Sequence, residues 1–104
     1  MSSFFVVRPE AEADIEEAHA WYESRSAGLG DRFLDAVEGA LGLIREAPAR
    51  FPVKHEEPDF SIRRSLVDGF PYGVFFIWDE VAGATSVIAC MHARRDPRRW
   101  LHRA

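Results

Sequence analysis

The chain has 104 residues, of which 47% are hydrophobic and 29% charged, with four histidines and one cysteine. This length suits one folded domain over residues 1–104 that needs no disulfide or metal to hold its core. The lone Cys90 excludes an internal disulfide and a thiolate zinc site, and its apolar neighbours predict a buried thiol. The apolar run near the N-terminus is too short for a signal peptide or a membrane span, so we expect a cytoplasmic protein without membrane contact.

The net charge of −4 is unevenly distributed. Residues 1–52 carry five arginines against ten acidic residues, whereas residues 92–104 carry five arginines against Asp96 alone. The overall acidity argues against indiscriminate binding of nucleic acid, because cationic contacts to phosphates dominate such binding. The sequence therefore predicts a basic C-terminal end on an acidic body.

A strand followed by a helix is predicted at the N-terminus. Residues 4–8 (FFVVR) are aromatic and β-branched and stop at Pro9, which is typical of a strand. Pro9 is favourable at the first position of a helix, and the acidic residues that follow it complement the helix dipole. The helix is predicted to run to about Ser24, with a core-facing stripe made of Ala11, Ile15, Ala18 and Tyr22.

A glycine-containing break at residues 26–30 predicts a tight turn into a second, antiparallel helix. This helix should end near Ala47, because Pro48 disfavours helical geometry in the residue before it. Its core stripe is predicted to be Leu29, Phe33, Val37, Ala40 and Ile44. Three apolar residues lie off the two stripes and either pack the helices on each other or form a groove for a partner segment: Trp21, Leu34 and Leu41.

The second half of the chain predicts an antiparallel meander. Residues 48–59 contain three prolines and should be mostly loop, with at most a short edge strand around Phe51 to Lys54. Residues 60–67 alternate as a strand does, with Arg63 and Arg64 on opposite faces. Residues 72–78 are nearly all apolar, as expected for a central strand, and residues 85–92 form the last strand. Two helices followed by a meander indicate an α+β domain of two layers.

Arginines dominate the candidate functional residues. Guanidinium groups bind phosphates or carboxylates through paired hydrogen bonds, and the alternative is a solvated basic end without a ligand. His92 could act as a general acid or base, or it could fix the end of its strand by hydrogen bonding. Trp100 could stack on a base or close the core. No spacing of histidines resembles a metal site and no nucleotide-binding motif is present, so neither metal nor cofactor is expected. The arginines in question are Arg63, Arg64, Arg94, Arg95, Arg98 and Arg99.

Two segments carry a family resemblance: IRRSLVDGFPYGVFF at residues 62–76 and VIACMHARRDPRRW at residues 87–100. The most specific parts are the GFPY turn at residues 69–72 and the H-x-R-R-x-P pattern at residues 92–97. With the order strand, two helices, meander, the chain resembles the RelE/ParE superfamily of toxins from type II toxin–antitoxin pairs, over Val7 to Trp100.

The resemblance implies a β-α-α-β-β-β fold in which a helical hairpin packs on a mainly antiparallel sheet of four to five strands. The first strand should lie beside the last. It also implies a cognate antitoxin, encoded nearby, whose C-terminal segment wraps the toxin in a hetero-oligomer. Members of the superfamily divide by target. RelE-like toxins cut mRNA on the ribosome, whereas ParE-like toxins poison DNA gyrase.

The cationic set of an RelE-like nuclease is incomplete in this chain. Gly73 stands where such a nuclease would place an arginine, and Lys54 is the only lysine. Arg99 and Trp100 occupy the place of the expected tyrosine. The resemblance therefore favours a ParE-like inhibitor that is not an enzyme. The alternatives are a ribosome-dependent endoribonuclease using Arg63, His92 and Arg95, and an inactivated toxin that only binds.

On the ParE-like interpretation, plasmid stabilisation and growth inhibition follow from binding to gyrase. Trp21, Leu34 and Leu41 are assigned to the antitoxin. The expected target-binding surface comprises Arg63, Arg64, Tyr72, His92, Arg94, Arg95, Arg98, Arg99 and Trp100.

Overall fold

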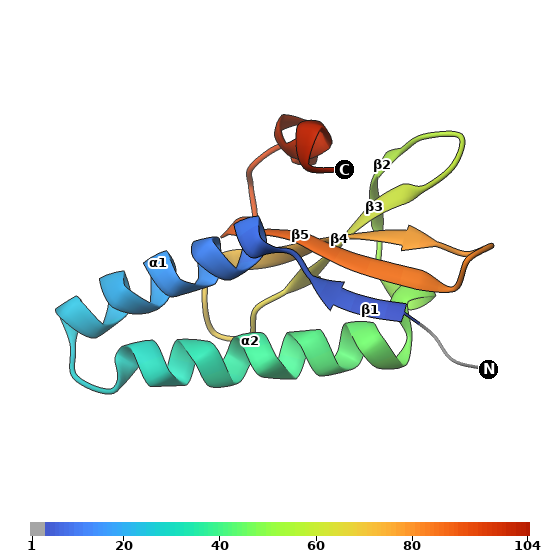
Figure 1. Cartoon of the computed structure of the whole chain (residues 1–104). Helices are drawn as coiled ribbons and strands as arrows, with labels where there is room; N and C mark the ends of the chain where they lie inside the picture. The colour runs from blue at the N-terminus through green and yellow to red at the C-terminus, as the bar shows by residue number, and fades with distance from the viewer. Residues whose placement is uncertain (1–3) are drawn as a thin grey trace.

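The computed structural model describes residues 4–104, so the first three residues of the chain lie outside the described part. Within it, two long helices follow the first strand, and four further strands lead to a short 3₁₀ helix at the C-terminus (Figure 1). The elements are β1 (Phe4–Val7), α1 (Pro9–Arg25), α2 (Leu29–Glu46), η1 (Pro48–Arg50), β2 (Val53–Glu56), β3 (Ser61–Leu66), β4 (Tyr72–Asp79), β5 (Ala84–His92) and η2 (Pro97–Arg103).

The five strands form one sheet in the order β1-β5-β4-β3-β2. β1 runs parallel to β5, and the other neighbouring pairs are antiparallel. The predicted α+β fold, with the first strand beside the last, is therefore confirmed. β1 pairs only with Ala84 to Val87, so β5 continues for five residues beyond the end of its neighbour. This leaves one edge of β5 open toward α1.

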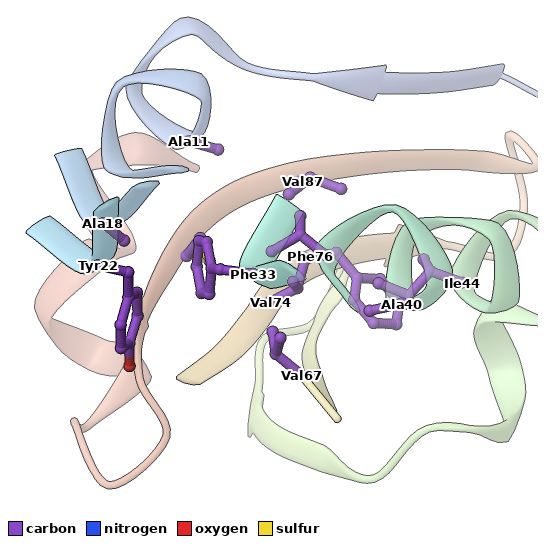
Figure 2. Close-up of a cluster of buried hydrophobic side chains, with 12 residues drawn as sticks. Ala11, Ala18, Tyr22, Phe33, Ala40, Ile44, Val67, Val74, Phe76 and Val87 are labelled. Carbon is purple, nitrogen blue, oxygen red and sulfur yellow. The ribbon is translucent and has the colours of Figure 1, made fainter. Parts of the chain in front are cut away.

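The helical hairpin packs on one face of the sheet through the predicted stripes. Phe33 and Ile44 of α2 are fully buried, and Ala11 and Tyr22 of α1 join them against the strands (Figure 2). Glycine at position 69 has φ +81°, in the left-handed region that favours this residue. It lets the chain turn from β3 into β4, and Phe70 from this turn packs edge-on against Tyr22.

The opposite face of the sheet has its own apolar cluster, and Trp100 belongs to it, which confirms core closure as one of the two roles predicted for this residue. Figure 1 shows α2 on one side of the sheet and η2 on the other. Trp100 of η2 is only 4% exposed, and its ring centroid lies 5.0 Å from that of Phe75. The C-terminal segment thus covers part of the second face. The buried members of this cluster are Ile62, Phe75, Ile77, Ile88, Ala89 and Trp100.

The prediction for residues 48–59 needs one correction. The edge strand lies at Val53–Glu56 rather than around Phe51 to Lys54, and Pro48–Arg50 form a 3₁₀ turn. Pro52 has no N–H to donate, so the residue pairs between β2 and β3 begin at Val53. The Pro52 carbonyl still accepts a hydrogen bond from the Arg64 amide of β3. Of the helices described in residues 4–104, none is long and apolar enough to cross a membrane.

Candidate functional site

A groove of about 380 Å³ lies between α1 and the end of β5. Trp21, 49% exposed, stands on its helical wall, and Tyr22 and Tyr72 contribute aromatic side chains. The chain leaves the sheet at Arg8 to begin α1, so β1 pairs with only the first four residues of β5. The groove lies beside the rest of β5, which has no neighbouring strand on this side. The groove is lined by Asp14, Glu17, Ala18, Trp21, Tyr22, Pro71, Tyr72, Cys90, Met91 and His92.

The open edge of β5 turns backbone groups toward this groove. The Ala93 amide donates to the Pro71 carbonyl at 3.0 Å, so the hydrogen-bonded pairs of the β4/β5 ladder fall on odd-numbered residues of β5. The amides and carbonyls of Cys90 and His92 therefore point away from β4. Asp14 already accepts the Cys90 amide at 3.1 Å. The His92 carbonyl accepts the Arg95 amide, so the Cys90 carbonyl and the His92 amide are the groups that suit an extended peptide lying beside β5.

Charges of both signs surround the groove. Burial raises the pKa of the Tyr72 hydroxyl, Cys90 and Glu17 raise it further, and Arg95 opposes the shift. The groove therefore has an acidic helical wall and a basic end. Burial also raises the pKa of the Cys90 thiol to about 12, so this side chain is a neutral apolar group near neutral pH. The predicted buried thiol is confirmed.

The basic end is the turn that follows β5. Its backbone closes through a hydrogen bond from the Arg95 amide to the His92 carbonyl at 3.0 Å. The Arg94 amide donates to Nδ1 of His92 at 3.3 Å, which is the strand-fixing role predicted as one alternative for this histidine. Arg94 and Arg95 are exposed, and they form no ion pair with any residue in 4–104.

The next residues begin η2, where Arg98 is already engaged. Its guanidinium lies 2.7 Å from Asp96, and its amide donates to the same carboxylate at 2.9 Å. These bonds lower the pKa of Asp96 below its ordinary value. Arg99 is exposed beside this pair. Arg94, Arg95 and Arg99 are therefore the members of the predicted arginine set whose charges remain available.

Arg63 and Arg64 do not join this turn in the same way. The guanidinium of Arg63 donates to the carbonyls of Ala49 and Phe51, at 3.0 and 2.7 Å, on the helical side of the sheet. Arg64 lies on the other face and donates to the Ala93 carbonyl at 2.7 Å. The structure therefore brings Arg64 to the basic turn and holds Arg63 at η1, away from His92.

Two further assignments are changed by the packing. The Trp100 ring is buried against Phe75, so it closes the second core and has no surface to offer a target in this fold. Trp21 lines the groove, whereas Leu34 and Leu41 are not among its lining residues. Leu41 packs against the main core instead. The three apolar residues predicted to share one partner groove are thus separated.

An ion pair that the sequence did not predict anchors the C-terminus. Arg103 lies 2.9 Å from Asp14, and both side chains are largely buried, at 16% and 12% exposure. The same guanidinium nitrogen donates to the Ile88 carbonyl at 3.0 Å, and Arg8 donates to the Arg103 carbonyl. Asp14 and Arg103 are 89 residues apart, so no local pattern could have paired them.

A second polar cluster joins the two helices. His19, Glu23 and Asp31 place potential metal ligands within 4.8 Å of one another. Each has a partner already: His19 pairs with Asp31 at 3.2 Å, and Glu23 accepts the amides of Gly28 and Gly30. These hydrogen bonds connect α1 to the turn and the start of α2, and they explain why the three side chains lie close together.

The comparisons with known proteins agree with this fold. Residues 5–97 match the model of a family described as the ParE toxin of the type II toxin–antitoxin system, parDE. The fold also resembles a chain of the archaeal RelE–RelB complex from Pyrococcus horikoshii OT3, with 13% sequence identity, a TM-score of 0.53, and coverage of 91% of this chain and 99% of that one. No curated protein sequence matches the chain. The chain belongs to the ParE toxin family of type II toxin–antitoxin systems.

Proposed function

We propose that this protein inhibits growth by binding DNA gyrase through the basic turn at residues 92–99, and that a cognate antitoxin silences it. The observation that carries the proposal is the exposed set of Arg94, Arg95 and Arg99, which form no ion pair within residues 4–104, on a chain that is otherwise acidic. Such a local concentration of charge steers an anionic or acidic partner to one end of the molecule. Gyrase as the target follows from the resemblance to ParE-like toxins.

Binding is favoured over RNA cleavage because a catalytic set is not assembled around the turn. Arg63 is bonded to two carbonyls of the η1 region, so it is not directed toward His92 and Arg95. Nδ1 of His92 is occupied by the Arg94 amide. Arginine is too weak an acid to supply the missing base, since its pKa exceeds 12. The ribosome-dependent endoribonuclease therefore remains the alternative with less support.

Replacing Arg94 and Arg95 together by alanine should reduce toxicity at least about tenfold, because two exposed guanidinium contacts to the target are lost. The readout is the level of induced protein that halves the growth rate. Both side chains are exposed and outside the core, so the free energy of unfolding should stay within about 0.5 kcal/mol of the parent. Arg50→Ala, an exposed arginine in η1, is the matched control. Full toxicity of the double variant would contradict the assignment of the turn to the target.

We assign the antitoxin to the groove at Trp21. An extended antitoxin segment would meet an exposed indole, the outward carbonyl of Cys90 and the outward amide of His92. Buried tryptophans at interface centres contribute strongly to affinity, so Trp21→Ala should weaken the complex about tenfold or more. The measurement is titration calorimetry with the antitoxin encoded by the neighbouring gene.

Leu43→Ala provides the control for this test, because Leu43 is 58% exposed on α2 and is not among the groove residues. It should change the affinity by less than about twofold. Equal affinities for the Trp21 variant and the parent protein would show that the antitoxin binds elsewhere. Failure of any neighbouring gene product to bind would instead argue against the toxin–antitoxin proposal itself.

A further inference from the structure

The basic turn is attached to the sheet at few points. On the β4 side, the Ala93 amide donates to the Pro71 carbonyl at 3.0 Å. The Ala93 carbonyl accepts from Nη1 of Arg64 at 2.7 Å. Arg64 comes from β3, two strands away from β5 in the sheet. Its side chain therefore crosses β4 to reach the turn that carries Arg94 and Arg95.

Gly73 makes this crossing possible. It is buried in β4 at the point where the Arg64 side chain passes over the strand. A Cβ atom placed on Gly73 would lie 2.9 Å from both Cγ and Cδ of Arg64. Real Cβ atoms essentially never come this close to another carbon, so even alanine would displace the arginine. Glycine is thus required here by the path of a neighbouring side chain.

The chemistry of Arg64 indicates more than packing. Its Nε is buried and has no hydrogen-bond partner within residues 4–104, and its guanidinium forms no ion pair there. Leaving such a donor unsatisfied costs stability, which a residue selected for packing alone would not need to bear. The hydrogen bond that its guanidinium donates goes to Ala93, the second residue of the basic turn.

We propose that Arg64 is a positioning residue: threaded over Gly73, it fixes the turn at residues 92–95 so that Arg94 and Arg95 are held in one orientation toward the target. The proposal rests on the proposed function of the turn. The arginine comes from β3, the neighbour of β4, and acts on the backbone of the turn.

Two variants test the proposal from opposite sides. Arg64→Met keeps an apolar chain over Gly73 but removes the donor, and Gly73→Ala keeps the arginine but blocks its path. Both should speed amide hydrogen exchange at residues 93–96 by about tenfold or more, because the turn loses a tie to the sheet. Both should reduce toxicity, whereas Arg64→Lys, which retains a donor, should restore part of it. Leu66→Ala, on the same strand and 60% exposed, is the control.

A double-mutant comparison separates positioning from a direct contact. If Arg64 acts through the turn, then Arg64→Met should have no further effect on toxicity once Arg94 and Arg95 are alanine. An additive loss would overturn the proposal and indicate that Arg64 contacts the target itself. Unchanged exchange at residues 93–96 in both single variants would also overturn it. The exchange measurement needs no target, so it remains decisive if the parent protein is not toxic and the proposed function fails.

Discussion

Trp100→Ala is expected to lower the free energy of unfolding by about 3 to 5 kcal/mol, the usual cost of deleting a large aromatic side chain from a core. The ring is 4% exposed and stacks at a tilt on Phe75, in the cluster that covers the second face of the sheet. Its loss would leave a cavity under η2. Because small domains have total stabilities of only about 5 to 15 kcal/mol, the variant should be marginally stable. Urea denaturation followed by circular dichroism measures the change.

The exposed Trp21 of the groove supplies the comparison for the buried Trp100. Trp21 is 49% exposed, so Trp21→Ala should cost less than about 1 kcal/mol in the same experiment. Trp100→Phe should recover a large part of the stability, since an aromatic ring still packs on Phe75. Equal and small effects for both alanine variants would mean that the Trp100 ring is not part of the core, and would reopen its assignment to the target-binding surface.

Asp14→Ala should lower the free energy of unfolding by about 3 kcal/mol, because it leaves the guanidinium of Arg103 buried without its carboxylate. The same change removes the acceptor of the Cys90 amide. Arg103→Met should destabilise the protein less when Asp14 is already alanine than when it is present, since the two side chains act as one unit. Thermal and urea unfolding of the parent protein, the two single variants and the double variant measure the coupling free energy between the two side chains.

The exposed pair between Asp96 and Arg98 is the natural control for this cycle. The Arg98 and Asp96 side chains are 69% and 44% exposed, so water screens the ion pair. Arg98→Ala removes the pair but keeps the hydrogen bond from the amide of residue 98 to Asp96, so it should leave the urea midpoint unchanged within error. If Asp14→Ala and Arg98→Ala behaved alike, the C-terminal anchor would contribute no more than a surface ion pair. The account of η2 as a segment fixed to the sheet would then be wrong.

The local patterns in the sequence predicted the fold well. The stripe of Phe33, Val37 and Ile44 has helical spacing, and it packs on the sheet as expected. The nearly apolar stretch of β4 lies in the interior of the sheet. These features were predictable because a helix or a strand repeats its buried positions at short, fixed intervals. The family resemblance added the order of the strands.

The site was less predictable because it depends on contacts between distant residues. The contact from Arg64 over Gly73 to Ala93 connects β3 and β4 to the turn after β5, and the pair of Asp14 and Arg103 connects the two ends of the chain. Neither leaves a periodic signal in the sequence. The separate positions of Arg63 and Arg64 followed from strand alternation, but their carbonyl partners did not.

The central claim is tested most directly by supercoiling of relaxed plasmid by purified gyrase in the presence of this protein, with mRNA cleavage mapped separately in a culture that expresses it. We predict loss of supercoiling or accumulation of cleaved DNA complexes, with intact transcripts, and no such effect from Arg94→Ala/Arg95→Ala. Normal supercoiling together with cuts phased to codons would contradict the claim. That result would instead support RNA cleavage by the turn at His92.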